Sequence, residues 1–66
     1  MARVDVDATI PPEWMTPAAL YDVIAFIRRL RIFPSSKREL LARWALIVGA
    51  DVPTDQYTYV MGIDRR

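Results

Sequence analysis

The sequence predicts a small, mainly α-helical protein. Two stretches carry apolar residues at helical spacing, and each begins near a residue that suits the start of a helix. The chain has 66 residues, which is enough for one domain. We therefore expect a single domain that contains an N-terminal arm (1–15), a helical hairpin (16–49, with helices at about 17–32 and 37–48) and a C-terminal element (50–66).

The N-terminal arm has the pattern of an extended segment. Residues 3–7 alternate between charged and apolar side chains, which is the period-two pattern of a strand. Pro11 and Pro12 then end any strand. We expect either a short edge strand or an extended segment that lies across the helices, with Trp14 as its strongest anchor.

The first helix is predicted to begin near Thr16. Thr16 can cap a helix, and Pro17 suits the first helical position because its missing N–H would be unpaired there. Pro34 ends the helix at about residue 32 or 33. At 100° per residue, one apolar stripe contains Leu20, Val23, Ile24, Ile27 and Leu30.

The second helix is predicted to begin with a capping box. Ser36 and Glu39 have the Ser-x-x-Glu spacing, and Glu39 also pairs with Arg43 one turn later. Gly49 is placed to stop the helix. The apolar stripe of this helix contains Leu40, Leu41, Trp44, Ile47 and Val48.

The C-terminal element allows two interpretations. Residues 54–61 favour a short helix, which would bring Tyr57, Val60 and Met61 together. The same residues are also good strand material, and their natural partner would then be residues 4–6.

The composition argues against an enzyme. The chain has no cysteine and no histidine, so it lacks thiol chemistry, the commonest metal ligand and the usual general base. Two glycines cannot build a glycine-rich phosphate loop. We expect no catalytic residues, no metal site, no cofactor and no small-molecule substrate.

No segment of the sequence predicts contact with a membrane. Residues 1–15 carry three acidic side chains and no apolar stretch typical of a signal peptide. The longest apolar run, residues 44–50, is too short to span a bilayer. We expect a cytoplasmic protein.

Basic residues gather in the middle of the chain, and a hairpin would bring most of them to one end. They are Arg28, Arg29, Arg31, Lys37, Arg38 and Arg43, with one acid, Glu39, among them. The first three also suit the C-terminus of the first helix, where cations are stabilised by the helix dipole. The alternative is a DNA- or RNA-binding regulator that uses this basic end.

The predicted order of short strand, helix and helix is loosely similar to that of the ribbon-helix-helix repressors. In that comparison residues 3–8 would form the strand, and the segment from Ser36 to Leu41 would start the second helix. The resemblance implies a dimer made by strand pairing, with Arg3, Asp5 and Asp7 facing the major groove of DNA. Pro11 to Met15 and Pro34 depart from the pattern of that family.

Leu46 does not fit the apolar stripe of the second helix. With Leu40 at zero, it falls at about 240°, outside the stripe and beside the small Ala42. It is either covered by the C-terminal element or Trp14, or it belongs to a surface that binds a protein partner or a second copy of the chain. Aromatic residues dominate such surfaces. The predicted interface residues are Trp14, Ala42, Leu46, Tyr57 and Tyr59.

Overall fold

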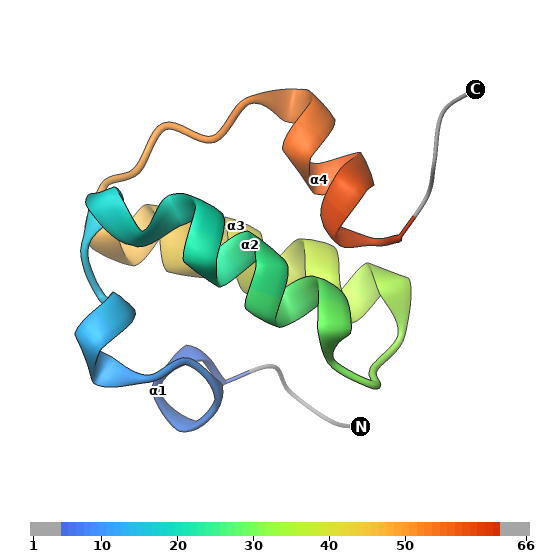
Figure 1. Cartoon of the computed structure of the whole chain (residues 1–66), viewed down its shortest axis with the longest axis horizontal. Coiled ribbons are helices and arrows are strands. Elements are labelled where there is room, and N and C mark those ends of the chain that lie inside the picture. The colour runs from blue at the N-terminus through green and yellow to red at the C-terminus, as the bar shows by residue number, and fades with distance from the viewer. Residues whose placement is uncertain (1–4, 63–66) are drawn as a thin grey trace.

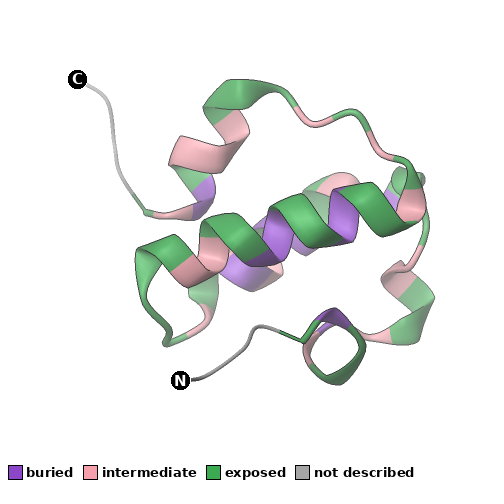
Figure 2. Ribbon diagram, turned by 180° about the vertical axis from the view of Figure 1, so that it is seen from behind, coloured by how far each residue is buried: buried purple, intermediate pink, exposed green. Residues whose placement is uncertain are grey.

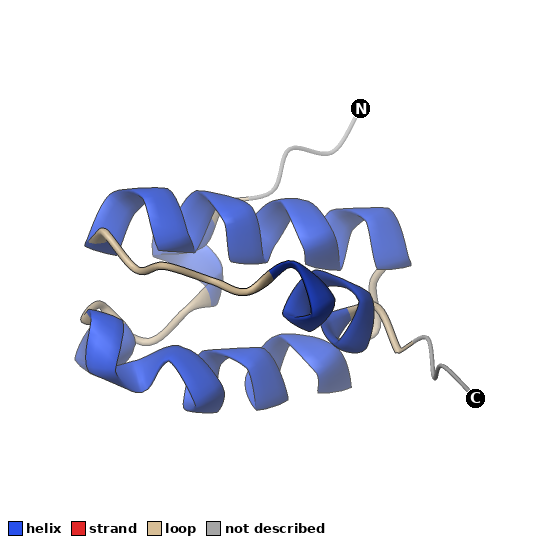
Figure 3. Ribbon diagram, turned by 90° about the horizontal axis from the view of Figure 1, so that it is seen from above, coloured by secondary structure: helices blue, strands red, loops and turns tan. Residues whose placement is uncertain are grey.

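The computed structural model describes residues 5–62, and this part of the chain contains four α-helices, two short 3-10 turns and no strand. The prediction of a mainly helical protein is confirmed. The two longest helices, α2 (Leu20–Arg29) and α3 (Pro34–Val48), are joined by residues 30–33. They lie side by side (Figures 1 and 3).

The shorter elements cover this pair of helices from two sides. Helix α4 (Thr54–Val60) packs against both α2 and α3. On the opposite side, α1 (Val6–Thr9) contacts α3, and the 3-10 turn Pro12–Trp14 contacts α2 (Figure 1). One apolar core therefore receives side chains from every helix of the described chain.

Helix α2 is shorter than the predicted helix (about 17–32) at both ends. A 3-10 turn, Pro17–Ala19, precedes α2 and has Pro17 at its first position, whereas the Thr16 side chain makes no capping hydrogen bond. The helix stops at Arg29, because Leu30 already has extended backbone angles (φ −67°, ψ 148°). Three residues of the predicted stripe are buried: Val23, Ile24 and Ile27.

Helix α3 starts earlier than the capping box predicts. Phe33 is extended (φ −62°, ψ 146°), as expected for a residue that precedes proline, and Pro34 occupies the first turn. The Ser36 N–H donates to the Phe33 carbonyl over 2.9 Å, so Ser36 lies inside the helix and does not cap it. Proline thus separates the two helices and begins the second. Gly49 stops α3 in the left-handed conformation (φ 75°), as predicted.

The buried stripe of α3 is displaced from its predicted position. Leu40, Leu41 and Trp44 are fully buried, as predicted. Ile47, however, is 59% exposed, and Ala45 takes its place in the core at 7% exposed. Three elements, α1, α2 and α4, pack on α3, and together they enclose Ala45 and leave Ile47 in solvent.

The prediction of an extended N-terminal arm is wrong for the residues that the structure describes. Asp5 caps α1, and its carboxylate accepts the N–H of Asp7 over 3.1 Å. The alternation of residues 3–7 is too short to compete with this cap, and Arg3 and Val4 lie outside the described residues. The strand alternative for residues 54–61 is also wrong, since α4 is a helix. The similarity to ribbon-helix-helix repressors therefore fails at the strand.

Candidate protein-binding face

One side of α3 presents apolar side chains to solvent. Leu46 is 84% exposed, Ile47 is 59% exposed, and Ala42 lies one turn before Leu46 on the exposed side. We call these three residues the outer face of α3. Figure 2 is seen from the α3 side and shows exposed and buried residues alternating along this helix. The outer face is formed by adjacent turns of a 15-residue helix, so its backbone is fixed before any partner binds.

No described segment covers Leu46, although the sequence allowed Trp14 or the C-terminal element to do so. Trp14 instead packs edge to face against Phe26 of α2, with ring centroids 5.3 Å apart. Its backbone carbonyl accepts the indole N–H of the buried Trp44 over 2.9 Å. Trp14 is therefore an intrachain anchor that ties the N-terminal segment to both long helices.

The two tyrosines of α4 also have partners within the chain. The guanidinium carbon of Arg28 lies 4.6 Å from the centre of the Tyr59 ring, and its Nε–H donates to the Tyr59 carbonyl over 3.0 Å. The guanidinium of Arg38 lies 5.7 Å from the centre of the Tyr57 ring. These contacts fasten α4 to α2 and α3. Of the predicted interface residues, Ala42 and Leu46 are the ones that lie together on the outer face of α3.

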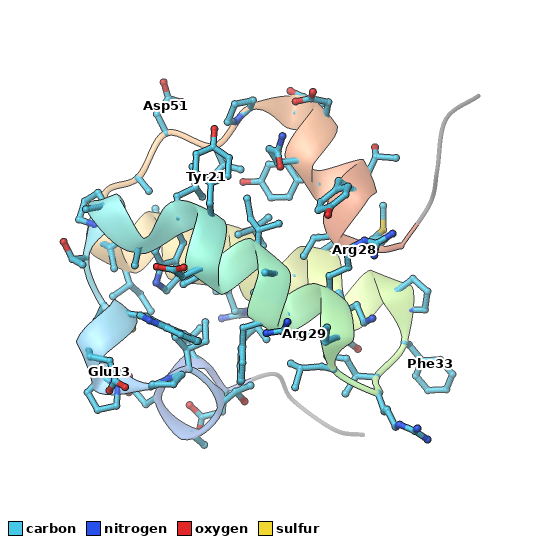
Figure 4. All side chains as sticks on the ribbon, in the orientation of Figure 1. Glu13, Tyr21, Arg28, Arg29, Phe33 and Asp51 are labelled. Carbon is cyan, nitrogen blue, oxygen red and sulfur yellow. The ribbon has the colours of Figure 1, made fainter. Side chains whose placement is uncertain are left out.

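Most residues of the basic cluster contact other residues of the same chain. The Lys37 ammonium donates to the Arg28 carbonyl at the end of α2, where a cation is favoured by the helix dipole. Arg43 pairs with Glu39 over 2.9 Å, as the sequence predicted. Arg28 extends toward α4 (Figure 4), whereas Arg29 and Arg31 are exposed to solvent. Four of the six basic residues thus have intrachain contacts: Arg28, Lys37, Arg38 and Arg43.

A groove of about 770 Å³ lies between α1 and the link that joins α2 to α3. Leu30, Ile32, Phe33 and Leu40 give it a mainly apolar lining, with the charged Arg31 among them. Within residues 5–62, no group of three or more acidic side chains is arranged to hold a metal ion. The other polar residues of the lining are Asp5, Thr9 and Ser36, so a ligand in this groove would meet both apolar and polar side chains.

These features define a small helical protein with an exposed apolar helix face. No protein-family model matches the chain, and neither a curated protein nor a solved structure matches it. In the part of the chain that the structure describes, every helix is too short or too polar to cross a lipid bilayer.

Sequence reasoning missed Ile47 as a member of the exposed face. The signal was its place at the margin of the predicted stripe, at about 340° on the helical wheel, one turn after Arg43. A position at the margin becomes exposed when the neighbouring helices pack toward the other margin. The positions of the neighbouring helices cannot be read from the sequence of α3 alone.

Proposed function

We propose that this chain is a non-catalytic protein-binding protein, and that it binds another protein chain, including a copy of itself, through the outer face of α3. The observation that supports this proposal is the 84% exposure of Leu46 in the last turn of the long helix α3. Full burial of a leucine side chain contributes roughly 1.5–3 kcal/mol, so a partner that covers Leu46 gains substantial free energy.

The surroundings of Leu46 favour a protein as the partner. Ala42 is small, which lets a second backbone approach closely beside Leu46. Ile47 adds a second exposed apolar side chain about 100° around the helix from Leu46, and the exposed Glu39–Arg43 ion pair lies between the two. Protein interfaces combine apolar and polar groups in this way. Because the helix is already formed, little conformational entropy is lost on binding.

The alternative function, nucleic-acid binding, gains no specific support from the geometry. Arg28 and Arg38 lie against tyrosine rings, and Lys37 donates to a backbone carbonyl. These side chains are therefore engaged in holding the helices together. The proposal that the protein is not an enzyme rests on the sequence, which lacks histidine and cysteine.

The variant Leu46→Glu tests whether Leu46 serves the fold or a partner. Because the side chain is exposed, we expect its free energy of unfolding to stay within about 0.5 kcal/mol of the wild-type value. Thermal unfolding followed by circular dichroism at 222 nm measures this. A clear loss of stability would place Leu46 in the fold and would contradict the proposal.

A photo-crosslinking amino acid at position 46 tests binding directly in cells that express the full chain. We expect a covalent protein adduct from position 46. Position 21 is the control and should give none, because Tyr21 is comparably exposed (68%) but lies on α2, outside the outer face of α3 (Figure 4). Adding Ala42→Arg, which blocks close approach at the same face, should abolish the adduct. Equal labelling from positions 46 and 21, or an adduct that survives Ala42→Arg, would contradict binding at this face.

A further inference from the structure

We infer that the partner at the outer face of α3 is a second copy of this chain, packed antiparallel to the first with the two-fold axis near Ala42. The inference rests on the proposed function and identifies the partner. It starts from the spacing of the exposed residues. Steps of four and three residues along α3 connect Ser35, Glu39, Ala42, Leu46 and Gly49, and all five are exposed.

Residues with this four-three spacing lie in one line along a helix. Two helices that pack side by side meet along such a line, which we call the seam. On α3 the seam runs from the second residue of the helix, Ser35, to its C-cap, Gly49, on the side that is exposed to solvent. The seam has the small Ala42 at its centre and the large Leu46 one turn later. With the axis near Ala42, the two helices approach most closely at the alanines. Leu46 of each copy then lies on the helical turn that precedes Ala42 in the other copy.

The charges on α3 select the antiparallel arrangement. Glu39 lies on the seam and Arg43 lies beside it; a 2.9 Å ion pair joins them, and both side chains are about half exposed (49% and 51%). In an antiparallel pair, Glu39 of each copy comes within reach of Arg43 of the other copy. A parallel pair would instead place Glu39 beside Glu39, because residues on the seam of a parallel pair meet their own copies. Antiparallel packing also sets opposite ends of the two helix dipoles side by side.

The rest of the molecule permits this contact. The formal net charge of the chain is +1, so two copies do not repel each other strongly. A 15-residue helix is about 22 Å long, and one such helix pair buries less than the ~1,600 Å² of a standard interface. The dimer is therefore a weak one, and it forms at high protein concentration.

Two charge-reversal variants of the full chain test the arrangement, Glu39→Arg and Arg43→Glu. Each one places like charges across the two-fold axis twice, and should weaken the dimer by about tenfold. A one-to-one mixture should restore dimers near the wild-type strength, because the arginine introduced at position 39 of one variant then faces the glutamate introduced at position 43 of the other. Sedimentation equilibrium up to millimolar concentration measures the dissociation constants. Circular dichroism at 222 nm confirms that each variant is folded.

The mixture separates contacts between copies from the ion pair within one helix. Each variant lacks the intrahelical pair, alone or mixed, so recovery in the mixture arises only from pairing between chains. A wild-type protein that stays monomeric up to millimolar concentration would overturn the inference. So would a dimer that both variants leave unchanged, or one that the mixture fails to restore. The proposed function survives each of these results if position 46 still crosslinks to a different protein in cells.

Discussion

The indole of Trp44 connects the core to the N-terminal segment, and its replacement by phenylalanine measures that connection. Trp44 is fully buried, and its N–H donates to the Trp14 carbonyl over 2.9 Å. Phenylalanine removes this donor, at a cost of about 0.5–1.5 kcal/mol. It also leaves a void of roughly 40 Å³, which at about 24 cal/mol per Å³ adds ~1 kcal/mol. We therefore expect Trp44→Phe to lower the free energy of unfolding by about 2 kcal/mol.

This loss is large for so small a chain. At roughly 0.05–0.15 kcal/mol per residue, the whole protein has about 3–10 kcal/mol of stability. Urea unfolding followed by circular dichroism is the assay. With a slope of ~1 kcal/mol per M, the midpoint should fall by about 2 M. The smaller truncation keeps the variant folded, whereas Trp44→Ala would cost about 3–5 kcal/mol and approach the total.

Trp14→Phe is the matched control. Trp14 is half-buried, and the acceptor of the hydrogen bond is its backbone carbonyl, which the substitution leaves in place. Phenylalanine also retains an aromatic ring against Phe26. The midpoint of Trp14→Phe should therefore fall much less than that of Trp44→Phe. If both variants lose the same stability, or if Trp44→Phe has the same urea midpoint as the wild type, the hydrogen bond to the Trp14 carbonyl does not hold the N-terminal segment as we describe.

Two further substitutions test the ends of the long helices by the same urea assay. Gly49→Ala should cost about 1–2 kcal/mol, because Gly49 has φ 75° while an added Cβ meets no atom within 4 Å, so backbone strain is its whole effect; an unchanged midpoint would show that α3 ends differently. Lys37→Met keeps the aliphatic stem but removes the donor to the Arg28 carbonyl, and should lower the free energy of unfolding by about 1–2 kcal/mol. The control Arg29→Met removes an exposed cation from the last turn of α2. An equal loss of stability in both variants would argue against the specific contact.

The local signals in the sequence predicted much of the helical structure. Val23, Ile24 and Ile27 are buried as their spacing indicates, and Gly49 ends α3 in the conformation that glycine favours. The helical angle of Leu46 alone sets it apart from the stripe, and the structure leaves it exposed. Such features depend on residues within one or two turns of each other, so the sequence contains them directly.

The features that the sequence could not supply depend on contacts between distant segments. Arg28 meets Tyr59 across 31 positions of the chain, and no spacing rule relates the two residues. The exchange of Ile47 for Ala45 in the core depends on how the other helices pack on α3. The contacts of the basic cluster are of the same kind: Arg28 and Arg38 lie against tyrosine rings of α4, and Lys37 donates to a carbonyl of α2.

The brevity of α1 and α4 determines how the molecule can come apart. They have four and seven residues, and helices shorter than about 12 residues are unstable alone in water. Each exists only while its apolar side chains, Val6 for α1 and Val60 for α4, remain in the shared core. When either helix separates from the core, it therefore unfolds, and part of the core becomes exposed to solvent at the same time. We therefore expect few partly opened forms and a single cooperative unfolding transition.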